Sequence, residues 1–186
     1  MTAARGSLEI LVGPMFSGKT DELIRRARSE TRPSVVLKPA VDTRHEPDRI
    51  VSHSGASIAA VTVSGGDDLA LAAAGADAIF VDEVQFLDRG LAEAFELLRR
   101  GGVDVVAAGL DLDFRREPFP PTAALVAIAD RVERFDARCG RCGRAATVTQ
   151  RLVNGRPAPL DDPVVRIGDE ELYDPRCEDC WESERA

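Results

Sequence analysis

Two groups of residues have the types and the spacing that phosphoryl transfer requires. The first is GPMFSGKT, Gly13 to Thr20, which fits the pattern G-x-x-x-x-G-K-[ST]. In this pattern a glycine loop turns successive backbone amides toward phosphate oxygens. Lys19 can then reach the β- and γ-phosphates, and the hydroxyl of Thr20 can bind Mg²⁺. We therefore predict a binding site for a nucleoside triphosphate at this loop.

The second group is a pair of acids, Asp82 and Glu83, that directly follows the apolar run AIFV. In proteins with such a phosphate loop, the first acid commonly holds Mg²⁺, and a second residue can orient or deprotonate the nucleophile. A base must lie within hydrogen-bond reach of the hydroxyl that it deprotonates. The residues alone leave open whether Glu83 is a base or positions a water molecule.

The four cysteines form two Cys-x-x-Cys pairs, Cys139 with Cys142 and Cys177 with Cys180. Four thiolates make a closed tetrahedral zinc set, so we expect a structural Zn²⁺ without an open position for catalysis. Redox chemistry and four unrelated thiols are the alternatives. The long interval between the pairs predicts a substantial loop that the metal ties at its base. The two histidines, His45 and His53, are expected on the solvent or phosphate side rather than at the metal.

The elements that must position these groups follow from the pattern of apolar residues. We expect strands over 8–12, 35–38, 78–81 and 103–108, and helices over 19–29, 67–74 and 90–100. Residues 39–56 are polar and are expected to form an irregular, mobile loop. The alternation of strands and helices predicts an α/β fold with a mostly parallel sheet and helices on both faces. Ligands bind at the carboxyl ends of such strands, where the phosphate loop and the two acids lie.

Composition limits the architecture and the partners. The chain has 186 residues, 44% of them hydrophobic, which suits one domain with a small appendage. Because the composition changes after Arg138, we expect an ATP-binding core over 1–136 and a zinc-binding domain over 137–186. The net charge of -8, from 24 basic and 32 acidic residues, argues against nucleic acid as a partner. No segment resembles a membrane span or a signal peptide, so we expect a cytoplasmic protein.

Together these motifs resemble the type II, zinc-containing thymidine kinases, from about Leu8 to Cys180. The matching segments are GPMFSGKT, KPAVDTR, VDEVQF, GLDLDFRREPF, CGRCGRAATVTQR and IGDEELYDPRCEDC. The resemblance implies a P-loop NTPase core of the RecA-like type and a C-terminal zinc-binding lasso that closes over the nucleoside. It implies transfer of the γ-phosphate of ATP to the 5′-hydroxyl of thymidine, in the salvage of pyrimidine deoxynucleosides. It also implies a homotetramer and feedback inhibition by thymidine triphosphate.

The resemblance assigns roles by motif position. Glu83 matches the general base, and Thr20 and Asp82 match the Mg²⁺ ligands. The positions that match ATP and phosphate contacts are Gly13, Pro14, Met15, Phe16, Ser17, Gly18, Lys19, Thr20, Asp42, Arg44, Asp82 and Gln85. The positions that match nucleoside contacts are Met15, Phe86, Leu110, Phe114, Phe119, Thr149, Val164, Arg166 and Tyr173. Arg166 stands where a small apolar residue is common in the family, and its backbone is the expected contact.

A second hypothesis shares the phosphate loop and the acids but belongs to another class. It is a zinc-ribbon P-loop ATPase that acts on nucleic acid or protein. The acidic composition and the apolar residues near Glu83 disfavour it, and it predicts ATP hydrolysis that DNA or RNA stimulates. A GTPase switch is a third possibility, but the chain has no N-K-x-D motif to read guanine. A kinase with a broader range of deoxynucleosides is a variant of the first hypothesis.

Overall fold

The computed structural model describes residues 4–43, 46–88, 90–164 and 172–183. Two positions matched to ligand contacts, Arg44 and Arg166, lie outside the described residues, as does His45. In the described part of the chain, no helix combines the length and the apolar character needed to cross a bilayer.

Six parallel strands form the central sheet, in the order β5-β2-β6-β7-β1-β8. Four of them confirm the predicted strands, and β5 and β8 at the two edges were not predicted. Their exposed apolar residues, such as Val61 and Val132, alternate with polar ones in runs too short to give a clear pattern. The strands are β1 (Leu8–Val12), β2 (Ser34–Pro39), β5 (Val61–Val63), β6 (Ala78–Val81), β7 (Asp104–Gly109) and β8 (Arg131–Arg134).

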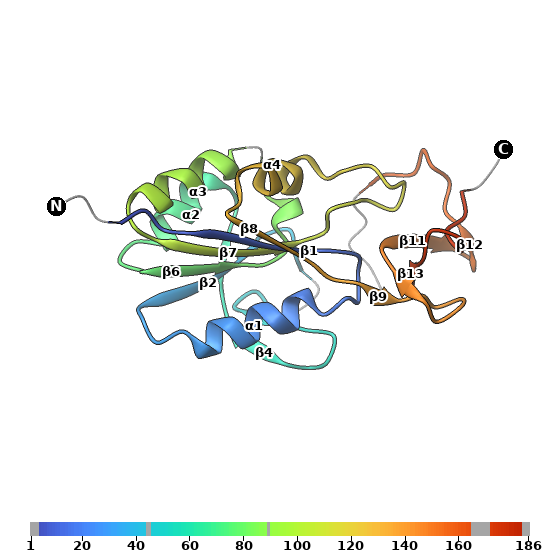
Figure 1. Cartoon of the computed structure of the whole chain (residues 1–186), viewed down its shortest axis with the longest axis horizontal. Helices are drawn as coiled ribbons and strands as arrows, with labels where there is room; N and C mark the ends of the chain where they lie inside the picture. The colour runs from blue at the N-terminus through green and yellow to red at the C-terminus, as the bar shows by residue number, and fades with distance from the viewer. Residues whose placement is uncertain (1–3, 44–45, 89, 165–171, 184–186) are drawn as a thin grey trace.

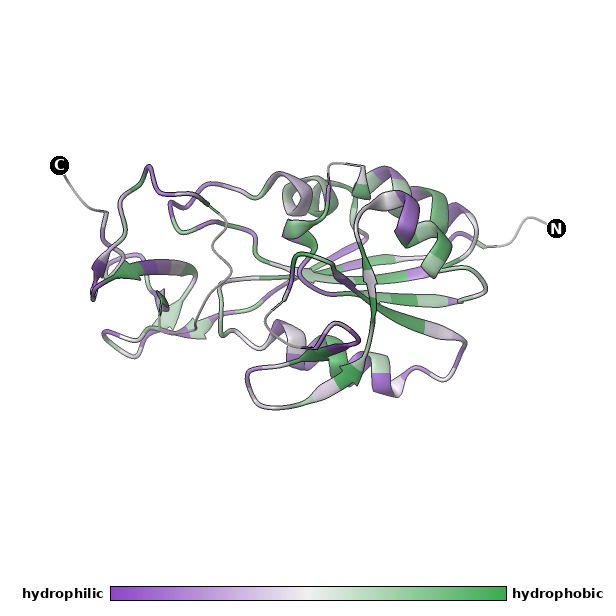
Figure 2. Ribbon diagram, turned by 180° about the vertical axis from the view of Figure 1, so that it is seen from behind, coloured by the Kyte–Doolittle hydropathy of each residue, from purple (hydrophilic) through white to green (hydrophobic). Residues whose placement is uncertain are grey.

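Helices cover both faces of the sheet, as expected. Helices α2 (Gly66–Ala72), α3 (Leu91–Arg100) and α4 (Pro120–Ile128) lie on one face, and α1 (Lys19–Ser29) lies on the other (Figure 1). Successive residues of β1 point to opposite faces. Ile10 therefore packs in the core under α3 with Phe95, whereas Leu11 packs against Leu23 of α1. Figure 2 shows hydrophobic residues concentrated along the strands and on the helix surfaces that meet them.

The loop predicted over 39–56 is wrong in part, because it contains the first strand of a hairpin. Strand β3 (Arg49–Val51) pairs antiparallel with β4 (Ser57–Ala59), beside α1. Ile50 pairs with Ile58, is buried, and joins the core on the α1 face. One buried apolar pair in a polar segment gives too weak a pattern to predict from sequence. The hairpin is held by its packing on the helix rather than by its own propensity.

A buried arginine fixes the amino ends of the strands. The guanidinium of Arg99 in α3, 1% exposed, donates hydrogen bonds to Asp130 Oδ2 at 2.5 Å and to the carbonyl oxygen of Gly6 at 3.3 Å. Asp130 also accepts from the main-chain N–H of Leu8, at the start of β1. A buried charge is tolerated when it is paired in this way. The charged groups at this end of the sheet therefore have a structural role.

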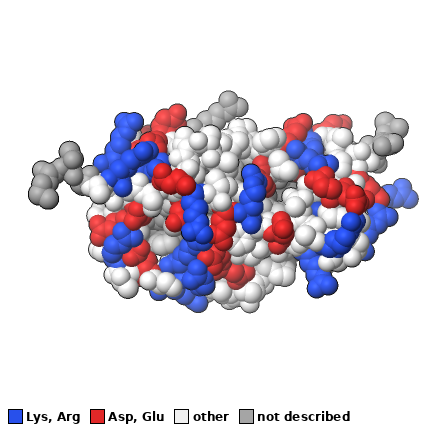
Figure 3. Space-filling model, viewed as in Figure 1, with Lys and Arg blue, Asp and Glu red and all other residues white. Residues whose placement is uncertain are grey.

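The C-terminal part of the chain lies beyond the carboxyl ends of the sheet strands (Figure 1). It contains a two-stranded sheet of β9 (Ala137–Arg138) and β10 (Ala145–Ala146). A three-stranded antiparallel sheet follows, made of β11 (Val148–Val153), β12 (Arg156–Pro157) and β13 (Tyr173–Arg176). On the molecular face shown in Figure 3, acidic and basic side chains are interspersed rather than gathered by sign.

Candidate functional site

The phosphate loop joins β1 to α1 at the carboxyl edge of the sheet, where only certain residues fit. Gly13 has φ 147°, and a Cβ there would lie 2.2 Å from the carbonyl oxygen of Phe135, so the position requires glycine. Phe16 and Gly18 also have positive φ, at 62° and 87°. Gly18 is the N-cap of α1, and the first N–H groups of a helix have no acceptor within the helix itself. Such a helix end favours anions.

The segment that ends the phosphate loop meets Asp82, at the end of β6, through the hydroxyl of Thr20. The ammonium of Lys19 is buried and donates to the carbonyl oxygen of Pro14 at 2.6 Å. The Thr20 hydroxyl donates to Asp82 Oδ2 at 3.0 Å. Only β7 separates β1 from β6 in the sheet, so the loop and the acid reach the same place. A hydroxyl beside a carboxylate supplies the oxygen ligands that Mg²⁺ prefers.

Glu83 lies where the backbone turns sharply out of β6 into the short 3₁₀ helix η1 (Val84–Phe86). Its φ of 52° and ψ of 41° place it in the left-handed region, which is costly for a residue with a side chain. Such conformations gather at functional sites. The amide of Gln85 donates to Glu83 Oε2, and Gln85 Oε1 accepts from the main-chain N–H of Leu110 at 3.0 Å. Gln85 thus connects Glu83 to the chain that leaves β7.

A single cavity of about 570 Å³ contacts these groups and the residues predicted to contact a nucleoside. Its floor is the phosphate loop and the ends of β6 and β7, and its outer side comes from the C-terminal part. Every described position that was matched to an ATP or nucleoside contact lines it, except Gly13 and Pro14. These lining residues are Met15, Phe16, Ser17, Gly18, Lys19, Thr20, Asp42, Asp82, Gln85, Phe86, Leu110, Phe114, Phe119, Thr149, Val164 and Tyr173. Glu83, which was matched to the general base, lines the cavity as well.

The sequence reasoning missed one wall of this cavity, formed by the β3–β4 hairpin. Arg49, Ser52 and His53 line the cavity from this side. The ring of His53 meets the ring of Phe16 edge to face, with centroids 5.1 Å apart. This places the histidine beside the phosphate loop, the side expected from sequence. The sequence signal for this wall is the apolar pair Ile50 and Ile58, which is too weak to predict a hairpin.

Strand β11 connects the C-terminal part to the phosphate loop. The main-chain N–H of Met15 donates to the Thr149 hydroxyl oxygen at 3.0 Å. Thr149 is 3% exposed and pairs in register with Pro175 of β13, close to Tyr173 on the same strand. Both Thr149 and Tyr173 line the cavity. The cavity is therefore closed by residues more than a hundred positions away from the loop that forms its floor.

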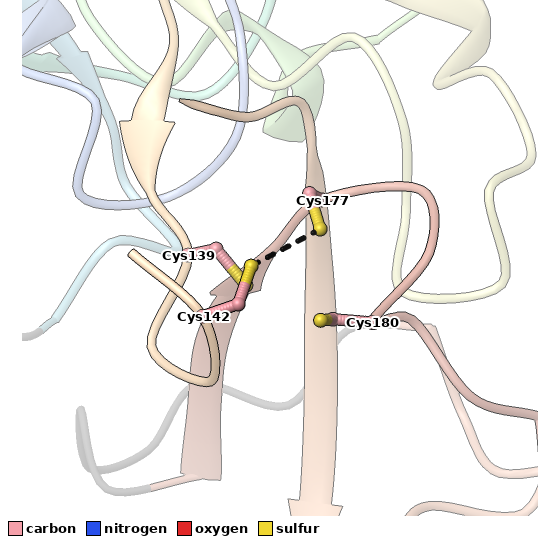
Figure 4. A group of neighbouring side chains, drawn as sticks. All are labelled: Cys139, Cys142, Cys177 and Cys180. Carbon is pink, nitrogen blue, oxygen red and sulfur yellow. Dashed lines mark hydrogen bonds between the residues drawn. The ribbon is translucent and has the colours of Figure 1, made fainter. Parts of the chain in front are cut away.

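The four cysteines come together as the spacing predicted. Cys139 and Cys142 lie on the turn between β9 and β10, and Cys177 and Cys180 lie on the segment after β13 (Figure 4). All four Sγ atoms lie within 4.8 Å of one another, and Cys142 Sγ is 3.6 Å from Cys177 Sγ. None of the four is in a disulfide. Zinc held at about 2.3 Å by four sulfurs separates them by about 3.8 Å, so the set fits a tetrahedral metal ion.

The surroundings favour thiolates at two of these sulfurs. Burial raises the pKa of the Cys139 thiol, but main-chain N–H groups of Cys177, Cys142 and Arg141 outweigh burial and lower that pKa to about 6. The Arg144 side chain lowers the pKa of the Cys142 thiol and donates to its Sγ at 3.5 Å. The thiol of Cys142 in turn raises the pKa of Cys180 to about 12. A bound cation would oppose this effect and favour the thiolate of Cys180, the form that ligates a metal.

The chain was compared with models of known protein families. The family described as thymidine kinase matches residues 6–181. The matched range includes the phosphate loop, the acids after β6 and all four cysteines.

Proposed function

Because the chain belongs to the thymidine kinase family, we propose that it transfers the γ-phosphate of ATP to the 5′-hydroxyl of thymidine, with Glu83 as the general base. One observation carries this proposal. A single cavity joins a phosphate loop, a conformationally fixed carboxylate and a set of aromatic side chains. Phosphoryl transfer to a small apolar-faced acceptor needs these three parts in one place.

The phosphates of ATP bind to the loop at the N-terminus of α1. Backbone N–H groups of the loop and of the helix N-terminus donate hydrogen bonds to the negatively charged phosphate oxygens. Lys19 exchanges its bond to the Pro14 carbonyl for phosphate oxygens. Thr20 and Asp82 would hold Mg²⁺, which neutralises charge on the phosphates when it is bound. These residues thus hold the phosphates of ATP, the phosphoryl donor, in place by hydrogen bonds and opposite charge.

The nucleoside occupies the apolar side of the cavity, next to Glu83. Phe86, Phe114 and Phe119 line this side, and Thr149 and Tyr173 supply polar atoms at its margin. A flat base binds well between apolar faces with a few hydrogen bonds at its edge. The same aromatic side chains keep water away from the carboxylate, which favours transfer to the nucleoside over hydrolysis.

Glu83 accepts the proton of the 5′-hydroxyl as the oxygen forms its bond to the γ-phosphorus. The bond from that phosphorus to the β-phosphate oxygen breaks, and ADP leaves with the electron pair. The Gln85 amide holds one carboxylate oxygen, Oε2, and is itself held by the N–H of Leu110. A base positioned in this way is expected to contribute about 10²–10⁴ in rate.

The four-cysteine cluster is proposed as a structural zinc site. Its ligands are Cys139, Cys142, Cys177 and Cys180. They join the two ends of the segment that carries Thr149, Val164 and Tyr173 to the cavity. The metal therefore holds the outer wall of the nucleoside site without taking part in the chemistry.

Several wider properties belong to the same proposal. We propose that residues 1–136 form the ATP-binding kinase core and residues 137–186 the zinc-binding domain with its lasso. We also propose a homotetramer in the cytoplasm that thymidine triphosphate inhibits as the end product. These follow from the resemblance to the type II family rather than from a contact in the structure.

The experiment that tests the function is transfer from labelled ATP·Mg²⁺ to a panel of nucleosides, with DNA and RNA as parallel additions. We expect thymidine to be converted to its 5′-monophosphate and purine nucleosides to remain unlabelled. The deoxyuridine reaction measures how strictly the thymine methyl group is required, which is worth about 1–3 kcal/mol in a pocket. Phosphate release stimulated by DNA or RNA, with no nucleoside labelled, would instead identify a zinc-ribbon ATPase.

A further inference from the structure

A buried arginine outside the phosphate loop lies between two walls of the cavity. Arg151 of β11 is 1% exposed although it carries a positive charge. Its guanidinium stacks on the ring of Phe114, with Cζ 3.9 Å from the ring centroid. Its two terminal nitrogens donate to the carbonyl oxygen of Pro163 at 2.6 Å and to Asp162 Oδ2 at 2.7 Å. The main-chain carbonyl of the same residue accepts from Ala158 at 2.9 Å.

The partners of this guanidinium belong to opposite sides of the nucleoside site. Phe114 lines the cavity from the segment after β7, whereas Pro163 directly precedes Val164, which lines it from the segment after β12. Arg151 is two residues from Thr149 on the same strand, so both side chains point to one face of β11. That face of β11 therefore carries both Thr149, which lines the cavity, and Arg151, which contacts Phe114 and Pro163.

Only a guanidinium can make these contacts at the same time. Its flat face stacks on an aromatic ring while its edge donates hydrogen bonds in a fixed fork. A lysine ammonium has the charge but not the plane or the fork. Because a buried charge is costly unless it is paired, Arg151 holds Asp162 and the Pro163 carbonyl close to Phe114.

We propose that Arg151 is a positioning residue that sets the affinity for the nucleoside by holding the lasso segment 158–164 against Phe114. This inference rests on the proposed function, because it places the nucleoside beside these walls. The contacts of the Arg151 side chain described above lie on the nucleoside side of the cavity. Its replacement therefore weakens thymidine binding and leaves the ATP site intact.

The surrounding structure allows the test to be made on folded protein. The main chain of Phe114 is held separately, because its carbonyl oxygen accepts from the indole Nε1 of Trp181 at 3.2 Å. Asp162 is partly exposed, so Asp162→Asn keeps the shape of the side chain and an oxygen that can accept from Arg151, while it removes the negative charge that pairs with the buried guanidinium. Arg156 on the neighbouring strand β12 is exposed, so Arg156→Lys is the matched control for Arg151→Lys.

The experiment compares Arg151→Lys, Asp162→Asn and Arg156→Lys with the wild-type enzyme. We expect Arg151→Lys to raise the KM for thymidine about tenfold and Asp162→Asn about threefold, with the KM for ATP and kcat changed less than about twofold. In the nucleoside-free enzyme, amide hydrogen exchange over 158–164 should be about tenfold faster in Arg151→Lys. Arg156→Lys should match the wild type in every measurement.

Two results would overturn the positioning role. One is a thymidine KM within twofold of wild type in both Arg151→Lys and Asp162→Asn. The other is an equal rise in the KM values for thymidine and ATP, which would mean a general loss of structure. If Arg151→Lys does not fold, the thymidine KM of Asp162→Asn alone decides whether the positioning role stands. Failure of the proposed function is separate, because the wild-type enzyme would then label no nucleoside.

Discussion

The sharpest test of the proposed chemistry is Glu83→Gln, because the substitution keeps the shape of the side chain and removes its basicity. The amide oxygen of the new side chain can still accept from Gln85, whose own acceptor bond to Leu110 is untouched. The left-handed backbone at this position disfavours both residues equally, since Glu and Gln are both unbranched at Cβ. The cavity should therefore keep its geometry, and thymidine affinity should change little.

The size of the effect follows from the surroundings of the carboxylate. A general base contributes about 10²–10⁴ in rate, which corresponds to about 2.7–5.4 kcal/mol of activation free energy. Phe86, Phe114 and Phe119 line the same cavity and limit the access of a water molecule that could replace the base. We therefore expect Glu83→Gln to lower the rate of phosphoryl transfer about 10³-fold or more, in the upper half of this range.

The assay is single-turnover phosphoryl transfer by rapid quench, with enzyme in excess over thymidine and saturating ATP·Mg²⁺. This measurement reports the chemical step rather than product release. Glu93→Gln is the matched control, because Glu93 is exposed on α3 and does not line the cavity. A single-turnover rate within about threefold of wild type in Glu83→Gln would remove Glu83 from the role of base.

Three further predictions address other parts of the molecule. Chelation of the metal should lower thymidine affinity about tenfold or more while ATP affinity is retained; calorimetry tests this, and unchanged thymidine affinity in metal-free protein would contradict it. Gly109→Ala should lower kcat about 10- to 100-fold, because the Cβ of the alanine would lie 2.7 Å from Gln85 Oε1 and displace the side chain that holds Glu83. Steady-state kinetics at saturating substrates measure this, and an unchanged kcat would show that Gln85 is dispensable. Glu22→Gln should make the free energy of unfolding depend less on pH in acid. The reason is that the Arg25 guanidinium, together with Arg26, lowers the pKa of Glu22 from 4.5 to about 2 against the effect of burial. The stabilisation is thus complete above about pH 4.5 and is lost as the pH falls toward 2, so urea midpoints across that window should fall less in the variant than in wild type.

Local signals in the sequence were sufficient for several elements and for the metal site. The phosphate loop, α1 and the strand before Asp82 each have a pattern complete within about ten residues. The two Cys-x-x-Cys pairs needed only their spacing to predict a common cluster, which the sulfur atoms form. In each case the chemistry of a short segment permits few alternative structures.

Other elements have no such local pattern. Helix α4 begins with two prolines and is apolar on every side, so its 3.6-residue period is not visible in the sequence. Strand β3 depends on Ile50 packing against the α1 face, and edge strand β8 depends on pairing with β1. These elements form because the rest of the core is already in place, and a pattern over a few residues cannot report that.

The sequence by itself determined the phosphate loop, the acids after a buried strand, the four-thiolate set and the resemblance to a family that contains all of them. The sequence placed Thr20 and Asp82 at the same edge of the sheet, but only the tertiary structure showed their hydrogen bond and the strand order, with β7 between β1 and β6, that allows it. Only the tertiary structure gave Arg151 a role, because its guanidinium joins Phe114, from the segment after β7, to Pro163, from the segment after β12. A motif fixes which groups are present, whereas strand order and packing fix which of them meet.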